Sequence, residues 1–479
     1  MAEAIVHCHF YQPPRENPWL DAVELEPSAA PFHDWNARIT HQCYEPFAAA
    51  RLLDDAGHVV QRMNLYEWVS FDVGTTLARW LEVHSRHTYE AILAADRASV
   101  ARLGHGNAIA APYNHVILPL ASPRDRATEI RWGVDDFRRR FQREPEGFWL
   151  PETAVDEETL VALAEAGIRF TILAPHQVEH APPAGALLNF SAGGGRTIAL
   201  FIYDGALAHD AAFGRVLDNG VELARRLADE HVTVGHLADA ARLRSIALDG
   251  ETFGHHRQFA EMALARAVAE LTAKGKVCVE NYASVLARRN PTLEAILVEP
   301  SSWSCAHGVE RWRSNCSCGM DPTASHAWRR PLRAALNWLG RQLDDRFVER
   351  ATRVGDAWAM RDGYGAVAAS PLEERRAYAA SIAKEGGVIE TVTLLDGVRA
   401  RLGMFGSCAW FFDEVTGHET ELMLRLAAFA IDALASGDAA LEKEFMERLT
   451  WAKDDRPGGS DAAAVYLTRV LPLRAEQRR

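Results

Sequence analysis

The sequence predicts an α/β protein in which a parallel sheet closes into a barrel, followed by a mostly α-helical region. Three observations lead to this prediction. Apolar runs typical of strands alternate with helical segments of roughly 10–15 residues, which is the pattern of parallel sheets with crossover helices. Several of these runs end in histidines or carboxylates, as the strands of barrel enzymes often do. After about residue 326 the strand-like runs give way to Ala, Leu, Arg and Glu at helical spacing.

The first predicted strand covers Ala4–Phe10 and carries His7 and His9. Because side chains alternate along a strand, these two histidines point to the same side. Such a pair suits metal ligation or hydrogen bonds to sugar hydroxyls, and it also suits a polar layer inside the core. Tyr11-Gln12-Pro13-Pro14 ends the strand and begins a long loop.

The next elements lead to a short apolar segment that ends in a carboxylate. In order, we expect a helix at 48–55, a strand at 66–73, a helix from Thr75, a short strand at 105–110 and a helix at 128–141. The segment Gly147-Phe148-Trp149-Leu150-Pro151-Glu152 then precedes a helix with acids in its first turn, which Gly167 ends, and a strand at 169–174. This order puts Glu152 just past the carboxyl end of a strand, where α/β active sites form. The alternative is a loop glutamate paired with a neighbouring cation.

The pattern repeats in the second half of the barrel region. We expect strands at 197–203, 244–248 and 277–279, with helices at 221–230 and 258–274, the latter stopped by Gly275. Asp204 and Asp249 each follow one of these strands. A closed barrel therefore gathers the following residues at one face: His7, His9, Glu152, Asp204 and Asp249.

Glu152 and Asp249 are the candidate catalytic pair. Cleavage of a glycosidic bond needs two carboxyl groups, one ionised to attack or stabilise and one protonated to donate. Strand-end carboxylates that cap helices are the alternative interpretation of the same pattern.

Composition and charge narrow the class of protein. The net charge of -13 repels phosphate backbones, so a neutral sugar fits better than nucleic acid. No apolar run approaches the ~18 residues of a membrane helix, and the first residues enter a strand directly, so we expect a cytoplasmic protein. The seven cysteines form no disulfide framework. Cys305, His307, Cys316 and Cys318 match no zinc-finger spacing, and both a metal site and buried thiols remain open there.

Three motifs in this order resemble those of glycoside hydrolase family 57. They are His7-Cys8-His9-Phe10-Tyr11-Gln12-Pro13, with Tyr11 where that family has His, then Trp149-Leu150-Pro151-Glu152, and Asp249-Gly250-Glu251-Thr252-Phe253-Gly254-His255. The family's second and fifth motifs are assigned to His105-Gly106-Asn107 and to Trp303–His307. The resemblance covers residues 1–325, and residues 326–479 look like the helical domain that follows the barrel in one branch of the family.

The resemblance implies a distorted (β/α)7 barrel at 1–325, a helical domain at 326–479 packed on it, and a retaining enzyme acting on α-glucans or maltooligosaccharides. It implies Glu152 as nucleophile and Asp249 as general acid/base, about 5–6 Å apart. The expected stacking faces are Trp149, Trp303 and Phe253. The expected contacts to sugar hydroxyls are His7, His9, Asn107, His255 and His307. No cofactor, catalytic metal, nucleic acid or membrane partner is expected.

Two alternatives of other classes remain. One is a metal-dependent carbohydrate esterase or mannosidase on a related barrel, with His7, His9 and Asp249 as ligands. The other is a non-catalytic glycan-binding protein, which predicts the loss of one carboxylate.

Overall fold

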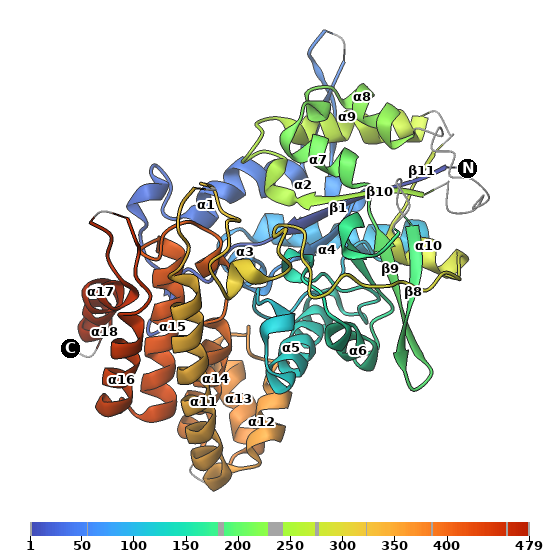
Figure 1. The fold of residues 1–479 in the computed structure, drawn as a ribbon. Coiled ribbons are helices and arrows are strands. Elements are labelled where there is room, and N and C mark those ends of the chain that lie inside the picture. The colour runs from blue at the N-terminus through green and yellow to red at the C-terminus, as the bar shows by residue number, and fades with distance from the viewer. Residues whose placement is uncertain are drawn as a thin grey trace. The chain divides into compact units, whose positions relative to one another are not determined.

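The computed structural model describes residues 2–54, 56–180, 186–228, 243–273, 277–321, 323–384, 387–456 and 458–477 (Figure 1). The chain forms two compact units. The first comprises Met1–Gln12, Leu25–Ala111 and Arg140–Glu299, and the second comprises Pro13–Glu24, Pro112–Arg139 and Pro300–Arg479. The division at residue 325 and the packing of the C-terminal domain on the barrel stay predictions. None of the helices in these described ranges is long and apolar enough to cross a membrane.

A parallel barrel forms the centre of the first unit. Its named strands are β1 (Ala2–Phe10), β6 (Ser70–Val73), β7 (Phe170–Leu173), β9 (Arg196–Ile202) and β10 (Leu243–Asp249). β1 pairs with β10 along one edge and with β6 and β11 (Val277–Val279) along the other, and β7 pairs with β9. Ile5, Val6 and Cys8 of β1 are buried, which explains why this strand reads as a continuous apolar run.

Two shorter segments complete the barrel between β6 and β7. They are joined by parallel bridges at Phe71–Ala108, Ala110–Phe148 and Gly147–Phe170. Between β9 and β10, the Asp204 N–H donates to the Ser245 carbonyl at 2.7 Å. Counted over the described residues, seven parallel segments therefore close the ring, which confirms the predicted distorted (β/α)7 barrel.

Helices and two antiparallel strand pairs supplement the barrel strands in this unit. The helices of this unit are α1 (Trp35–Ile39), α2 (Glu45–Ala48), α3 (Thr75–His84), α4 (Arg86–Leu103), α6 (Glu157–Glu165), α7 (Gly205–Phe213), α8 (Gly220–Leu227), α9 (Ala260–Ala273) and α10 (Tyr282–Arg288). β8 (Ala186–Gly193) pairs antiparallel with β9, and β4 (Ala50–Leu53) pairs with β5 (Val59–Met63). At α6 the Asp156 carboxylate accepts from the Thr159 N–H at 2.8 Å, and Gly167 ends the helix with φ +81°.

Some element boundaries differ from the prediction. The expected helix at 48–55 is wrong, because α2 ends at Ala48 and Ala50–Leu53 form a strand paired with β5. The helix expected to start at Gln258 begins at Ala260. Asp55, Glu230, Lys274 and Gly275, at the expected ends of three helices, lie outside the described residues.

The second unit is mainly helical, as predicted for the C-terminal region. It contains β2 (Glu16–Asn17), β3 (Ala22–Val23), α5 (Pro123–Phe141) up to Arg139, α11 (Arg329–Val354), α12 (Ala357–Tyr364), α13 (Leu372–Ile382), α14 (Val388–Gly403), α15 (His418–Ala435), α16 (Ala439–Leu449), α17 (Ala462–Val465) and α18 (Leu471–Gln477). α11, α14 and α15 pack against one another (Figure 1). The apolar residues at helical spacing in α11 are buried, namely Leu332, Ala335, Leu336 and Leu339. Burying each leucine contributes about 1.5–3 kcal/mol, so packing of these residues holds the long helix in place.

Candidate active site

The register of three neighbouring strands brings charged side chains together at the carboxyl end of the barrel. In the ladders of β1, His9 lies opposite Asp72 of β6 on one side and opposite Asp249 of β10 on the other. Opposite residues of parallel strands point to the same face of a sheet. His9 therefore lies between two carboxylates at this edge.

Asp72 is the partner of both predicted histidines. The His9 Nδ1 donates to Asp72 Oδ2 at 2.8 Å, and the His7 Nε2 donates to Asp72 Oδ1 at 3.2 Å. His7 Nδ1 also lies 3.1 Å from the Ser70 hydroxyl. Asp72 and His7 are fully buried, so His7 forms part of a polar layer in the core and is removed from the set of sugar contacts. Asp72 was not among the predicted site residues. It lies near the end of the next predicted strand, but only the register of β1 and β6 shows that it faces the histidines.

Only one imidazole of this cluster is positively charged at neutral pH. Burial opposes the charged form of His9, but the charge and hydrogen bond of Asp72, followed by the charges of Asp249 and Glu251, raise the pKa of His9 to about 9. Burial lowers the pKa of His7 below its ordinary value in spite of its bond to Asp72. Burial also acts on Asp72, yet the two histidines hold its pKa below the usual range. Asp72 is thus the main carboxylate that stabilises a single cation, His9, which lies opposite Asp249.

Trp149 forms the wall behind the two histidines. Its ring stacks on His7 with centroids 4.7 Å apart and on His9 with centroids 5.2 Å apart. The Trp149 side chain is fully buried. Its ring faces are therefore occupied by protein, and it is corrected from a sugar-stacking surface to a support for the histidines.

Glu152, which follows this wall, has an unusual backbone conformation. Its φ and ψ are 59° and 18°, and Thr153 also has a positive φ of 48°. Left-handed conformations cost non-glycine residues of order 1–3 kcal/mol each, so the surrounding structure must hold them. The buried Gln177 does so, because its amide nitrogen donates to the Thr153 carbonyl at 2.7 Å and its amide oxygen accepts from the Thr153 hydroxyl at 2.8 Å. The Glu152 side chain remains half-buried.

Asp249 ends β10 with its side chain exposed to water, although protein atoms crowd around it. These surroundings raise the pKa of Asp249 to about 6. The positive charge of His9 opposes this shift, while the negative charge of Glu152 and then that of Asp72 add to it. The two predicted carboxylates therefore interact electrostatically.

The rest of the third motif packs beneath Asp249. The Glu251 carboxylate accepts hydrogen bonds from the Tyr44 hydroxyl and from the Tyr11 N–H. Burial and the charge of Asp249 raise the pKa of Glu251 to about 7. A Cβ at Gly254, which has φ +140°, would lie 2.1 Å from the Gln42 carbonyl, so only glycine fits there. Glu251 and Tyr44 were missed, although Glu251 lies inside the motif itself.

Two further residues expected to contact substrate are buried. Phe253 is fully buried with its ring 5.7 Å from that of Phe47, so it offers no stacking face. Asn107 is also buried, donates to the Tyr66 carbonyl at 3.0 Å and accepts from Asn281 at 3.0 Å. Both are corrected to structural supports.

Asp204 caps a helix, whereas His255 stays a candidate contact to substrate. The Asp204 carboxylate caps α7 by accepting from the Leu207 N–H at 2.9 Å and lies 3.2 Å from Arg244, so it is not available for chemistry. His255 is half-buried, and its Nδ1 lies 2.8 Å from the Gln42 side-chain oxygen. Burial is the main cause that lowers the pKa of His255, so the ring is neutral at pH 7.

The two predicted residues of the fifth motif belong to the second unit. Trp303 is half-buried and His307 is exposed. His307 lies beside Cys316 and Cys318, with its Nδ1 at 3.2 Å and 3.5 Å from their sulfurs. This environment suits a ligand to a metal better than a contact to sugar hydroxyls.

Two protein-family models match two separate regions of the chain. Residues 39–293 match the model described as glycosyl hydrolase family 57, and residues 325–479 match one described as a domain of unknown function, DUF3536. A search of curated proteins found no significant match.

Several solved structures share the fold. An exo-type maltose-forming amylase from Pyrococcus sp. ST04 has a TM-score of 0.69 at 16% identity, covering 97% of this chain and 82% of that chain. A family 57 branching enzyme from Thermococcus kodakaraensis has a TM-score of 0.60 at 15% identity, covering 93% and 94%. A 4-α-glucanotransferase from Thermococcus litoralis has a TM-score of 0.53 at 16% identity, covering 90% and 59%.

Proposed function

The chain belongs to glycosyl hydrolase family 57, and from this we propose that it cleaves or transfers α-glucosidic bonds in α-glucans through a glycosyl-enzyme intermediate. The amylase, branching and glucanotransferase activities named for the solved structures of the same fold support this substrate class. The observation that carries the mechanism is the arrangement at the barrel edge, where Asp249 ends β10 opposite His9 and where burial, with the charge of Glu152 adding to it, raises the pKa of Asp249 to about 6.

Glu152 is the proposed nucleophile. Its carboxylate oxygen forms a bond to the anomeric carbon of the sugar while the bond from that carbon to the leaving oxygen breaks. A nucleophile must keep one orientation through this step. The left-handed backbone of Glu152 and Thr153, held by Gln177, supports such a fixed orientation.

Asp249 is the proposed general acid and base. With a pKa of about 6 it is protonated in about half of the molecules at pH 6 and in about a tenth at pH 7, and the protonated form gives its proton to the leaving oxygen. In the second step the ionised Asp249 takes a proton from water or from an acceptor hydroxyl, whose oxygen displaces Glu152 from the anomeric carbon. The exposure of the side chain supports both transfers, because water and acceptor must reach it.

His9 and His255 are the proposed contacts to sugar hydroxyls in the first unit, and Trp303 is the proposed stacking face in the second. His9 is 5% exposed, so only an edge of its charged ring can reach a ligand. Asp72 and Trp149 act through His9, the first by its charge and the second by its ring. The proposed partner is an α-glucan or maltooligosaccharide.

A metal-dependent esterase or mannosidase finds less support. Its ligands would be His7, His9 and Asp249, but both histidines already bind Asp72. Within the described residues, one group of His, Cys, Asp and Glu side chains has its donor atoms close enough together to bind a metal ion. That group contains none of these three residues.

Azide rescue tests the two proposed roles. Glu152→Gln has no nucleophile, so we expect no turnover of a maltoside with a nitrophenol leaving group. Asp249→Asn should still form the glycosyl-enzyme from this activated substrate, which needs little protonation, and the intermediate should accumulate. Azide needs no base, so it should restore turnover in Asp249→Asn and give a glycosyl azide of retained configuration. In Glu152→Ala it should give the inverted product.

Asp204→Asn is the matched control, because it changes a carboxylate at the same edge that caps a helix. We expect it to keep most of the activity and to gain nothing from azide. Rescue of neither catalytic variant, or products of the opposite configurations, would show that the roles are assigned wrongly. Product profiles from amylose and maltooligosaccharides then separate hydrolysis from transfer.

A further inference from the structure

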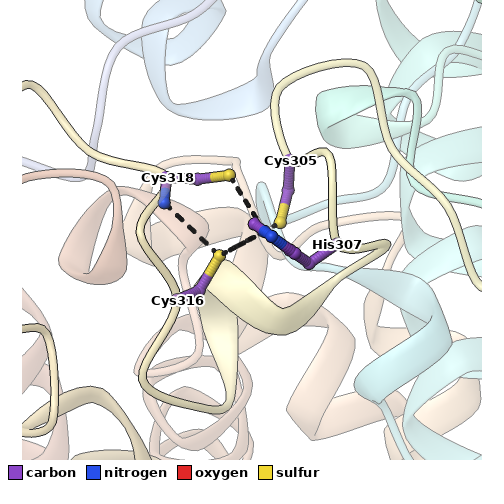
Figure 2. A group of neighbouring side chains, drawn as sticks. All are labelled: Cys305, His307, Cys316 and Cys318. Atoms are coloured by element: carbon purple, nitrogen blue, oxygen red, sulfur yellow. Dashed lines mark hydrogen bonds between the residues drawn. The ribbon is translucent and has the colours of Figure 1, made fainter. Parts of the chain in front are cut away.

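Three cysteines and one histidine gather in the second unit on either side of the short 3-10 helix at Glu310–Trp312. Cys305 and His307 precede this helix, and Cys316 and Cys318 follow it. Their sulfur and nitrogen atoms all lie within 4.8 Å of one another. Figure 2 shows the four side chains pointing toward one another. The sequence spacing alone matches no familiar pattern, but the fold brings two pairs, Cys-x-His and Cys-x-Cys, face to face.

The distances in this cluster fit the edges of a metal-centred tetrahedron. Zinc bonds of ~2.3 Å to sulfur and ~2.05 Å to nitrogen give edges of about 3.8 Å between sulfurs and about 3.6 Å between sulfur and nitrogen. The Cys305 and Cys316 sulfurs are 3.6 Å apart. His307 Nδ1 lies 3.2 Å from the Cys316 sulfur and 3.5 Å from the Cys318 sulfur. The separation of Cys305 and Cys316 is far longer than the ~2.05 Å of a disulfide bond.

Hydrogen bonds from neighbouring groups fix the backbone of Cys316 and Cys318, as is common around metal ligands. The Cys318 N–H donates to the Cys316 sulfur at 3.4 Å. The buried Arg329 at the start of α11 donates to the carbonyls of Cys316 and Cys318, at 3.0 Å and 2.9 Å. Arg311 donates to the same Cys318 carbonyl at 3.2 Å. Two guanidinium groups therefore lie next to a cluster that is net negative when a divalent ion holds three thiolates.

We propose that Cys305, His307, Cys316 and Cys318 bind one zinc ion. Three thiols lose their protons to solvent when the ion binds, and the neutral His307 ring supplies its Nδ1 as the fourth ligand. Tetrahedral sites with sulfur and nitrogen donors select zinc over hard cations such as magnesium or calcium. Four protein ligands leave no open position, so this zinc is structural and takes no part in glycoside chemistry.

The proposed ion links two loops, one of which is tied to α11, the helix that follows them in the second unit. It joins residues 305–307 to residues 316–318, and Arg329 ties the second loop to α11. Trp303, the proposed stacking residue, lies two residues before the first ligand. Ser302 next to it is held by a bond from its hydroxyl to the Gly308 carbonyl at 2.7 Å. Loss of the ion is therefore expected to loosen the segment that carries Trp303.

The test uses the full-length chain purified under reducing conditions with zinc in the growth medium. Elemental analysis should find one zinc per chain in the wild type and much less than one in Cys316→Ser. Cys408→Ser is the matched control, because Cys408 lies in the same unit outside the cluster, and it should keep one zinc. His307→Ala changes an exposed side chain and should weaken zinc binding in a chelator competition without unfolding the protein.

The wild type alone provides a second measurement if Cys316→Ser does not fold. Cobalt substituted for zinc should give the intense visible bands of a tetrahedral thiolate site, and X-ray absorption of the zinc form should show about three sulfurs and one nitrogen. Zinc retained equally in Cys316→Ser and Cys408→Ser would overturn the proposal. So would a wild type that takes up no zinc or cobalt, or one whose Cys305 and Cys316 are found disulfide-bonded after purification under reducing conditions.

Discussion

Replacing Asp72 by Asn removes the negative charge that bonds to both His7 and His9 at the carboxyl end of the barrel. The amide has nearly the size of the carboxylate and can still hydrogen-bond to one imidazole, so the change is mainly electrostatic. In the wild type, burial opposes protonation of His9, and the charge and hydrogen bond of Asp72 are the largest causes that overcome it. Without that carboxylate, only the weaker effects of Asp249 and Glu251 oppose the effect of burial on the ring.

The expected change follows from the pKa of His9. A pKa of about 9 exceeds the ordinary value of ~6.5 by ~2.5 units, which corresponds to about 3 kcal/mol. At pH 7.5 the wild-type ring is therefore about 97% protonated, whereas a ring with a pKa of ~6.5 or less is at most about 9% protonated. We expect the pKa of His9 to fall by at least two units in Asp72→Asn.

The same shift has a defined effect on stability. Because the folded-state pKa of His9 is raised, its contribution is fully present below pH ~6.5 and is lost as the pH rises through about 9. Asp72→Asn should lose this contribution, and the decrease in wild-type stability between those pH values should be absent from it. Urea unfolding at pH 6.5 and pH 9 measures the difference.

The pH profile of activity should shift as well. The positive charge of His9 lowers the pKa of Asp249, and it acts more strongly than the negative charge of Asp72 that raises it. Loss of both charges therefore raises the pKa of Asp249 above about 6, and the alkaline limb of kcat/KM moves to higher pH.

NMR titrations of the protein labelled at histidine measure the pKa of His9 in the wild type and in Asp72→Asn, with Ser70→Ala as the control. That variant removes a hydrogen-bonding partner of His7 without changing any charge, so His9 should still titrate near pH 9. A wild-type His9 that titrates near pH 6.5, or an unchanged His9 in Asp72→Asn, would refute the charge arrangement described above.

Two further variants probe the supports of each unit. Gln177→Leu removes the amide that holds Thr153 in its left-handed conformation, so the neighbouring Glu152, the proposed nucleophile, should shift; we expect kcat to fall about a hundredfold with little change in KM, and an unchanged kcat would contradict this role. In the second unit, Asp125 lies 2.6 Å from both Arg361 and Arg401, and although burial opposes it, these charges hold the pKa of Asp125 below the usual range. Asp125→Asn should cost about 3–5 kcal/mol in urea unfolding above pH ~4, and this cost should shrink as the pH falls through the pKa of Asp125.

The barrel could be predicted because its strands are buried on both faces. Ala4–Phe10 and Arg244–Leu248 read as apolar runs, and the structure has β1 and β10 at these positions. The segment at 48–55 was mispredicted because its Ala and Leu content favours a helix, whereas pairing with β5 provides the hydrogen bonds of a strand. Tertiary pairing of this kind leaves no local trace in the sequence.

Some residues of the candidate site could likewise be predicted from a local pattern in the sequence, whereas others depend on tertiary pairing. Glu152 and Asp249 could be proposed from the sequence because each follows a strand and precedes a helix, which is a pattern along the chain. Asp72 could not be assigned from such a pattern, because its importance depends on which strands are neighbours and on the register that puts it opposite His9. The burial of Phe253 was equally hidden, since a motif does not say which of its side chains face inward.

The position of Trp149 explains why a buried ring belongs in a motif that ends in the proposed nucleophile. Its ring stacks on His9, and His9 lies opposite Asp249 in the ladder between β1 and β10. Glu152 follows Trp149 by three residues, with the rigid Pro151 between them. The position of Glu152 relative to Asp249 therefore depends on a path through one ring contact and one pair of hydrogen-bonded strands. A buried aromatic side chain has few rotamers and many contacts, so it transmits position better than an exposed sugar-stacking ring could.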